Sequence, residues 1–192
     1  MTSFDEQVDA AFAPLRGRPG VDKAATVISN LADYGFVWVV LAGWKARRRG
    51  ADRRRSVVAL ALPGFSSLLV SRTIKQAVAR ERPDEHIAAK VRTPTSSSFP
   101  SGHTLAAFCT AFVLAETEVE TAAYVGFAGA VAASRIHLRA HHASDVVGGA
   151  AIGSVLGLGL RPIVHVLTPG SRGRRRRRVQ GMPAGATRLE RL

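Results

Sequence analysis

Three short blocks of polar residues supply the groups that are needed to hold a phosphate and to transfer it to a histidine. The blocks are Lys75, six residues and Arg82-Pro83; Pro100-Ser101-Gly102-His103; and Ser134-Arg135, five residues, His141, three residues and Asp145. A phosphoryl group carries negative charge on its oxygens, and the transition state of its transfer must be held and neutralised. Three cations can do this, so the sequence predicts a phosphate site that uses neither a metal ion nor a cofactor.

The three cations differ in how they can bind an anion. Arg82 and Arg135 each present a planar guanidinium group that suits two phosphate oxygens, and Lys75 adds a point charge. Pro83 should end a helix directly after Arg82. At Gly102 the backbone can approach closely, and its amide can reach an oxygen. The apolar run that follows the second block predicts that a helix begins there, which would place the phosphate at its positive end.

The two histidines of the blocks suit different steps of the transfer. His141 and Asp145 are four residues apart and share a face if the segment is helical. The carboxylate would then bind one ring nitrogen and leave the other free to attack phosphorus. His103, on a different segment, would protonate the leaving oxygen and later activate the water that cleaves the phosphohistidine.

The elements that must position these residues are predicted to be membrane helices. Five apolar stretches cover residues 24–44, 56–72, 104–115, 121–134 and 146–168, the last of them interrupted by Arg161-Pro162. A spanning helix needs about 20 apolar residues, which only the first stretch reaches cleanly. Flanking Lys and Arg side chains can extend the shorter stretches. Since 192 residues leave little polar material to cover five such stretches, we predict an all-α integral membrane helical bundle of about five spanning helices.

The two ends of the chain differ from this bundle. Apolar residues at helical spacing predict a short amphipathic N-terminal helix: Phe4, Val8, Ala11, Phe12 and Leu15. This helix could lie in the membrane interface or pack on the rest of the protein, and the pattern leaves both open. We predict that residues 1–170 form the membrane-embedded domain and that residues 171–192 form a basic, disordered tail.

The formal net charge of +13 is concentrated in two basic runs, Lys45 to Arg55 and Arg172 to Arg178. Such runs can bind nucleic acid or the anionic face of a membrane. The apolar stretches between them favour the bilayer as the partner and argue against nucleic acid. The positive-inside rule then places both runs in the cytoplasm. The sequence therefore predicts a multi-pass protein of the cell membrane, with its N-terminus and its active site on the extracytoplasmic side.

Taken together, the three blocks resemble the signature of the type 2 phosphatidic acid phosphatase (PAP2) superfamily, in its bacterial membrane lipid phosphatase branch. Every position of that signature is met between Lys75 and Asp145. The resemblance implies that His141 is the nucleophile, that Asp145 is its partner and that His103 is the general acid and base. It also implies a set of phosphate-binding residues: Lys75, Arg82, Ser101, Gly102 and Arg135. Many membrane members have six spanning helices, so the amphipathic N-terminal helix would take the place of the first.

The resemblance implies that the substrate is a phosphomonoester or a diphosphate on a lipid whose tail stays in the bilayer. Phosphatidate, phosphatidylglycerol phosphate, a polyprenyl diphosphate and a prenyl-linked sugar phosphate all fit, and the sequence does not choose between them. Two other interpretations stay open. A vanadate-dependent haloperoxidase shares the anion pocket, although such proteins are longer and soluble. A non-catalytic membrane protein could recruit anionic lipids or partners through its basic ends. The sequence indicates no oligomeric state.

Overall fold

The computed structural model describes residues 3–49, 53–83 and 97–169, and all regular elements within these ranges are helices. The α-helices are α1 (Ser3–Phe12), α2 (Pro19–Ala32), α3 (Phe36–Arg49), α4 (Arg53–Val78), α5 (Gly102–Leu114), α6 (Glu118–His137) and α7 (Ala143–Leu167). Short 3-10 helices, Ala13–Leu15 and Asp33–Gly35, follow α1 and α2. The predicted all-α class is confirmed, whereas the predicted tail 171–192 lies outside the described residues.

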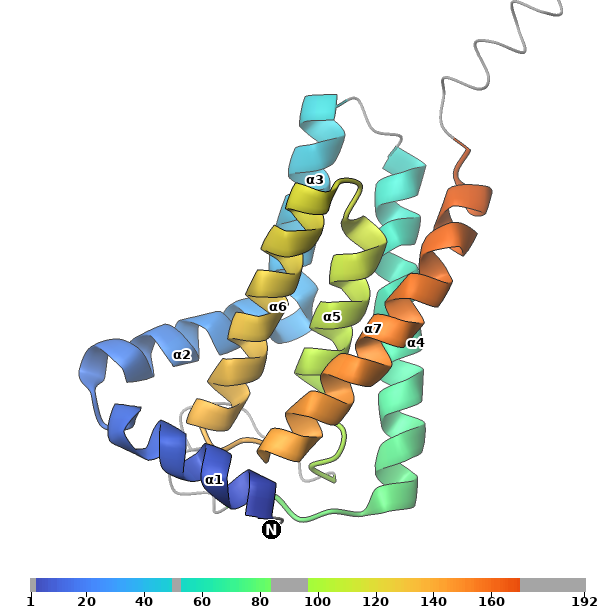
Figure 1. Ribbon diagram of the computed structural model, residues 1–192. Helices are drawn as coiled ribbons and strands as arrows, with labels where there is room; N and C mark the ends of the chain where they lie inside the picture. Colours follow the sequence, from blue (N-terminus) through green and yellow to red (C-terminus); the bar gives the residue numbers. More distant parts are fainter. Residues whose placement is uncertain (1–2, 50–52, 84–96, 170–192) are drawn as a thin grey trace, which may run out of the picture.

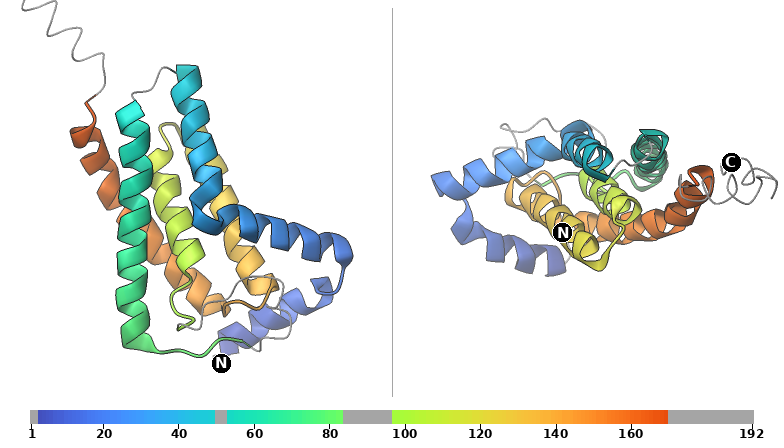
Figure 2. Two further views of the ribbon diagram at one scale, coloured as in Figure 1. Left: turned by 180° about the vertical axis from the view of Figure 1, so that it is seen from behind. Right: turned by 90° about the horizontal axis from the view of Figure 1, so that it is seen from above.

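The arrangement of the helices brings the three polar blocks together. α5 packs against α4, α6 and α7, and α3 lies beside α4 (Figure 1). α1 and α2 lie across the long helices toward one end of the bundle, as Figure 2 shows from behind and from above. At this end α4 and α6 finish, while α5 and α7 begin. Because the blocks lie on these four helix ends, the fold gathers them on one side of the molecule, opposite the end of α3 and the start of α4.

α7 approaches α5 closely because it presents glycines at a spacing of four residues. A Cβ atom on Gly157 would lie 2.6 Å from the carbonyl oxygen of Cys109, and one on Gly149 would lie 2.8 Å from that of Ser101. Gly153, between them, meets the backbone of α5 in the same way. Small residues let helices pack at short distance in lipid. The contact fixes the start of α7 against the start of α5, where the second and third blocks lie.

Two of the described helices, α4 and α7, are each long and apolar enough to cross a membrane, with windows of mean hydropathy 1.6. Two of the sequence-based expectations are corrected here. The first apolar stretch is not one clean helix, because α2 and α3 are bent by 64° at Asp33–Gly35 and pass only as a joined pair. Arg161-Pro162 does not interrupt α7. α5 has 13 residues, about 20 Å of helix against a hydrocarbon core of about 30 Å. The count of about five spanning helices stays a prediction.

The end of the bundle that lies away from the blocks is held by ion pairs. The Nζ atom of Lys45 lies 2.7 Å from a carboxylate oxygen of Glu120 and donates to the carbonyl oxygen of Leu114 at 2.9 Å. It thereby satisfies one of the carbonyl groups that the end of α5 leaves without a helical partner. Arg55 lies 3.1 Å from Glu116. Part of the first basic run therefore joins α3 to α6, and α4 to the turn before α6.

The predicted N-terminal helix forms and packs on α6 and α7, which is one of the two alternatives that the sequence left open. The face that it turns toward the protein carries an acid. Asp5 is only 2% exposed, whereas the neighbouring Phe4 is 46% exposed. The helix therefore docks through a buried carboxylate rather than through its first apolar side chain.

Candidate active site

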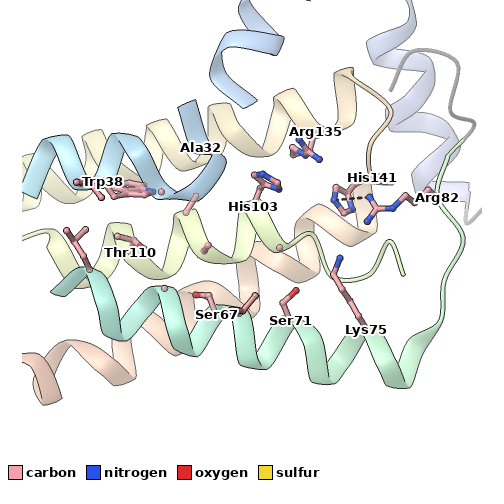
Figure 3. A pocket seen from close by; sticks show the side chains of 18 residues that line it. Ala32, Trp38, Ser67, Ser71, Lys75, Arg82, His103, Thr110, Arg135 and His141 are labelled. Atoms are coloured by element: carbon pink, nitrogen blue, oxygen red, sulfur yellow. Dashed lines mark hydrogen bonds between the residues drawn. The ribbon is translucent and has the colours of Figure 1, made fainter. Parts of the chain in front are cut away.

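A cavity of about 450 Å³ opens where the helix ends meet, and it is lined by six of the eight predicted site residues. They are Lys75, Arg82, Gly102, His103, Arg135 and His141. Figure 3 shows His103, Arg135, His141, Arg82 and Lys75 gathered around one end of this cavity. The three blocks, which are spread over residues 75–145 of the chain, therefore converge as the sequence predicts.

The first block is held by backbone oxygens from two other segments. α4 ends at Val78, five residues before Pro83, which corrects the predicted end of this helix. Lys75, in the last turn of α4, donates to the carbonyl oxygen of Ser97 at 3.0 Å. Beyond the helix end, Arg82 donates to the carbonyl oxygen of Ala140 at 2.8 Å. These bonds place both cations at the wall of the cavity, although the helix ends earlier than expected.

His141 is held by a backbone carbonyl group and not by a shared helical face. α7 begins at Ala143 with His142 as its N-cap, so His141 precedes the helix, contrary to the prediction from its spacing to Asp145. Its Nδ1 atom lies 2.8 Å from the carbonyl oxygen of Ser98. A carbonyl oxygen only accepts hydrogen bonds, so Nδ1 carries the proton and Nε2 carries the lone pair. Nε2 lies 3.4 Å from a guanidinium nitrogen of Arg82.

The surroundings of His141 keep its imidazole neutral. Burial is the main cause that lowers the pKa of His141 to about 3, and the guanidinium groups of Arg135 and Arg82 lower it further. The carboxylate of Asp145 acts in the opposite direction. A neutral imidazole with its Nε2 lone pair on the side of the cationic groups is the form that can attack an electrophilic phosphorus atom.

Asp145 stabilises the segment around His141. One of its oxygens accepts the backbone N–H of His142 at 2.9 Å and lies 3.8 Å from Nδ1 of His141, too far for a hydrogen bond. The other oxygen accepts from Arg80 at 2.6 Å. The predicted pair of His141 and Asp145 therefore exists as a charge contact, while the imidazole donates its hydrogen bond to the carbonyl oxygen of Ser98. Sequence reasoning missed both Arg80 and Ser98, since a main-chain acceptor leaves no mark in the residue types.

Arg135 is fully buried, yet within the part of the chain that the structure describes two of its three guanidinium nitrogens have no hydrogen-bond partner. Nη1 donates to the hydroxyl group of Ser29 on α2 at 2.5 Å. Among the residues that the structure describes, nothing accepts a hydrogen bond from Nε or Nη2. Buried polar groups are almost always hydrogen-bonded. A buried charged group with two unpaired donors, on a residue that lines a cavity, therefore indicates an anionic ligand.

His103 forms a second pair of histidine and carboxylate. It lies in the first turn of α5, as predicted, and its Nε2 atom is 2.5 Å from a carboxylate oxygen of Asp33. Asp33 lies at the break between α2 and α3. The bend that the sequence did not predict therefore brings a carboxylate to the histidine that was expected to act as acid and base.

The two residues that precede His103 differ in their position. Gly102 lines the cavity. Ser101, predicted to bind phosphate, is fully buried and is not among the lining residues. Its hydroxyl group accepts from Thr104 at 3.0 Å, and its backbone N–H donates to the carbonyl oxygen of Asp145 at 3.0 Å. Ser101 thus links the second block to the third.

Beyond the cationic end, the cavity continues as an apolar groove. Its walls come from α3, α4 and α5 and include Trp38, Val39, Leu60, Leu68 and Ala107. Figure 3 shows Trp38 on the side of the groove away from Lys75 and His141. A site with cations and imidazoles at one end and an apolar wall at the other suits a molecule with a phosphate head and a hydrocarbon tail.

Comparisons with known proteins find a matching family and several related phosphatases. The family model of the PAP2 superfamily matches residues 54–169 of the chain. The decaprenylphosphoryl-5-phosphoribose phosphatase of Mycolicibacterium smegmatis is 36% identical over 146 residues, which are 76% of this chain and 80% of that protein. Phosphatidylglycerophosphatase B of Bacillus subtilis is 29% identical over 170 residues, 80% of each chain.

Two solved structures are similar to the fold. The transmembrane PAP2 type phosphatidylglycerolphosphate phosphatase from Bacillus subtilis gives a TM-score of 0.68 at 23% identity and covers 88% of this chain and 90% of its own. Aquifex aeolicus LpxE gives a TM-score of 0.66 at 24% identity and covers 82% of this chain and 97% of its own. As the resemblance of its three blocks implied, the chain belongs to the PAP2 superfamily.

Proposed function

We propose that the protein hydrolyses a lipid phosphate through a phosphohistidine on His141, and that the lipid is a prenyl-linked sugar phosphate. The observation that carries this proposal is Arg135, a buried guanidinium group with two open donors at the wall of the cavity. The other groups at the same cavity end are Lys75, Arg82 and the neutral His141. Together they can hold a phosphate and attack it.

The first step forms a bond between Nε2 of His141 and phosphorus. As this bond forms, the bond between phosphorus and the lipid oxygen breaks, and His103 gives its proton to that oxygen. The products of this step are the lipid alcohol, the phosphohistidine and a neutral His103. Lys75, Arg82 and Arg135 stabilise the charge on the equatorial oxygens in the transition state.

The second step releases phosphate and restores both imidazoles. His103 takes a proton from water while the water oxygen attacks phosphorus, and the bond from phosphorus to Nε2 breaks. Asp33, 2.5 Å from Nε2 of His103, favours the imidazolium form that gives up its proton in the first step and is formed again in the second. The carbonyl group of Ser98 keeps the proton on Nδ1, so Nε2 is the nucleophile in each cycle.

The relatives support the choice of substrate class. The 36% identical relative is named for a decaprenyl-linked phosphoribose, whereas the 29% identical relative is named for phosphatidylglycerol phosphate. Both names describe a phosphate monoester on a lipid, which fits the cationic end and the apolar groove of the cavity. The higher identity favours the prenyl-linked sugar phosphate.

The charge distribution supports the predicted orientation in the membrane. Arg53 and Arg54 are exposed at the start of α4, at the end of the bundle away from the site. If that end is cytoplasmic, the site faces the extracytoplasmic side and the groove lies within the bilayer. In this orientation α4 and α7 would be two of the predicted spans, and the bent pair of α2 and α3 would be a third.

The experiment that tests the function measures inorganic phosphate released by the full-length protein, purified in detergent, from a panel of lipid phosphates. The panel contains a prenyl-linked phosphoribose phosphate, phosphatidylglycerol phosphate, phosphatidate and a polyprenyl diphosphate. We expect the highest kcat/KM with the first lipid and no turnover by His141→Ala. A higher kcat/KM with another lipid would change the substrate class. No release from any lipid, or release that His141→Ala leaves intact, would refute the mechanism.

A further inference from the structure

We propose that Asp5 of α1 is a positioning residue for the nucleophilic segment, so that this one side chain connects the N-terminal helix with the active site. This inference rests on the proposed function, since it concerns how His141 and Asp145 are held for that reaction. α1 lies outside the region that contains the three blocks, and no spacing rule connects it with them. Its link to the site is a chain of short contacts between buried groups.

Asp5 caps the start of α7 from another helix. One oxygen of its carboxylate accepts the backbone N–H of Ser144 at 2.8 Å, and the other accepts the hydroxyl group of Ser144 at 3.0 Å. Ser144 is the second residue of α7, where backbone N–H groups have no partner within the helix. A carboxylate is favoured at this position, both as an acceptor and because the helix dipole is positive there.

The same carboxylate holds Arg80 in a fixed orientation. Nη2 of Arg80 lies 2.7 Å from Asp5, and Nη1 lies 2.6 Å from Asp145. Nη1 also donates to the hydroxyl group of Ser144 at 2.7 Å. A single guanidinium group thus bridges two carboxylates whose side chains are both completely buried, one from α1 and one from the third block.

The bridge reaches the nucleophile through Asp145. The oxygen of Asp145 that Arg80 does not hold accepts the backbone N–H of His142 and lies 3.8 Å from Nδ1 of His141. If Asp5 loses its charge, Arg80 keeps only one of its two anionic partners, and the side chain of Asp145 loses a rigid support. The electrostatic field at Nδ1 and the position of residues 141–142 then become less well defined, while the cations that bind phosphate stay in place.

The burial of Asp5 itself argues that it has this role. Taking a carboxylate out of water is costly unless charged and hydrogen-bonding partners compensate for it. α1 carries two further acids: Glu6 stays exposed, and Asp9 pairs with Arg16 at 2.6 Å. The helix therefore turns one particular acid toward the start of α7, at the point where Arg80 and Asp145 meet.

The test compares Asp5→Asn with Glu6→Gln, two substitutions that remove one negative charge from neighbouring positions of α1. Both are made in the full-length protein in detergent and assayed with the panel lipid that wild type hydrolyses best. We expect Asp5→Asn to lower kcat at least tenfold, with KM within twofold of wild type, and Glu6→Gln to change neither. Thermal stabilisation by inorganic phosphate should be the same in both variants, since Lys75, Arg82 and Arg135 are untouched.

A second variant keeps the test decisive if Asp5→Asn does not fold. Arg80→Lys can reach one of the two carboxylates but cannot bridge them, and we expect a similar fall in kcat. If both variants fold, the fall in kcat of the double variant Asp5→Asn/Arg80→Lys should be no larger than that of the more impaired single variant, because both substitutions break the same bridge.

The outcomes separate this inference from the proposed function. A kcat of Asp5→Asn equal to that of Glu6→Gln, a loss confined to KM, or losses that multiply in the double variant would overturn the inference while wild-type turnover still supports the function. Absence of turnover in wild type would refute the function, and this inference with it.

Discussion

Replacing Arg135 by lysine tests the assignment of the phosphate site most directly. Nη1 of Arg135 is held by Ser29 at 2.5 Å, and its other two nitrogens are open for an anion. A lysine keeps the charge but has a single nitrogen. It can therefore bind the hydroxyl group of Ser29 or reach the phosphate in place of Nε and Nη2, but it cannot do both. The variant therefore separates the geometry of the guanidinium group from its charge.

The expected loss can be worked out from these contacts. A hydrogen bond to a charged group contributes about 1.5–3 kcal/mol. A lysine that reaches the phosphate makes one such bond where the guanidinium group can make two, so transition-state binding should weaken by about 1.5–3 kcal/mol. At about 1.36 kcal/mol for each factor of ten, kcat/KM should fall roughly 10- to 160-fold.

Two measurements on purified protein check this prediction. Release of phosphate from the preferred lipid gives kcat/KM, and thermal stabilisation by inorganic phosphate reports binding to the folded state. Arg72→Lys is the matched control, because Arg72 is exposed on α4 within one turn of Lys75. If Arg135→Lys keeps kcat/KM within threefold of this control and is still stabilised by phosphate, the two open nitrogens do not face the substrate, and the assignment is wrong.

Three further predictions concern other parts of the molecule. Asp33→Asn should slow release from a lipid phosphate far more than release from p-nitrophenyl phosphate, whose leaving group needs no proton from His103; equal losses with both substrates would contradict this role. Gly157→Ala should lower the free energy of unfolding by about 1–3 kcal/mol by overpacking against α5, whereas Gly159→Ala, with no atom within 4 Å of its added carbon, should not; thermal denaturation compares the two. Because burial lowers the pKa of His141 from 6.5 to about 3, the unfolded chain binds a proton in this range that the folded chain does not. The free energy of unfolding of the wild-type protein should therefore fall as the pH drops from 6.5 toward 3, and it should fall less in His141→Asn. The two slopes should differ by up to about 1.4 kcal/mol per pH unit. Thermal midpoints that change with pH in parallel in both proteins would exclude this contribution of His141.

The convergence of the three blocks could be predicted because residue type and spacing carry the chemistry of the site. Six of the eight predicted residues line one cavity. The partners of these residues could not be predicted in the same way. The bond that orients His141 comes from the carbonyl group of Ser98, and every residue has such a group. Arg80 lies two residues before Arg82, and sequence alone does not tell which arginine faces a carboxylate and which lines the cavity.

The helical class could also be predicted, but the breaks between the helices were less accessible. The first apolar stretch has the composition of one span, yet the chain bends at Asp33–Gly35, where Gly35 has a φ of 69°. A run of hydrophobic residues indicates burial or lipid contact, but it does not indicate the direction of the helix axis. A bend within such a run therefore leaves no mark in the hydropathy pattern. At Arg161-Pro162 the error was the opposite one, because a proline in the last turns of α7 did not end the helix.

The helices α2 and α3 on either side of the bend supply residues that support the site but belong to a different part of the chain from the reacting groups. The groups that would carry out the chemistry belong to the part matched by the family model, residues 54–169. Ser29, which binds Arg135, and Asp33, which binds His103, come from the part before residue 54. Trp38, in the wall of the groove, also comes from that part. Exchanging residues 3–49 between relatives would thus graft a different frame and a different tail-binding wall onto an unchanged set of reacting groups. In this architecture, substrate selectivity and turnover rate can differ among relatives whose three polar blocks are identical in sequence.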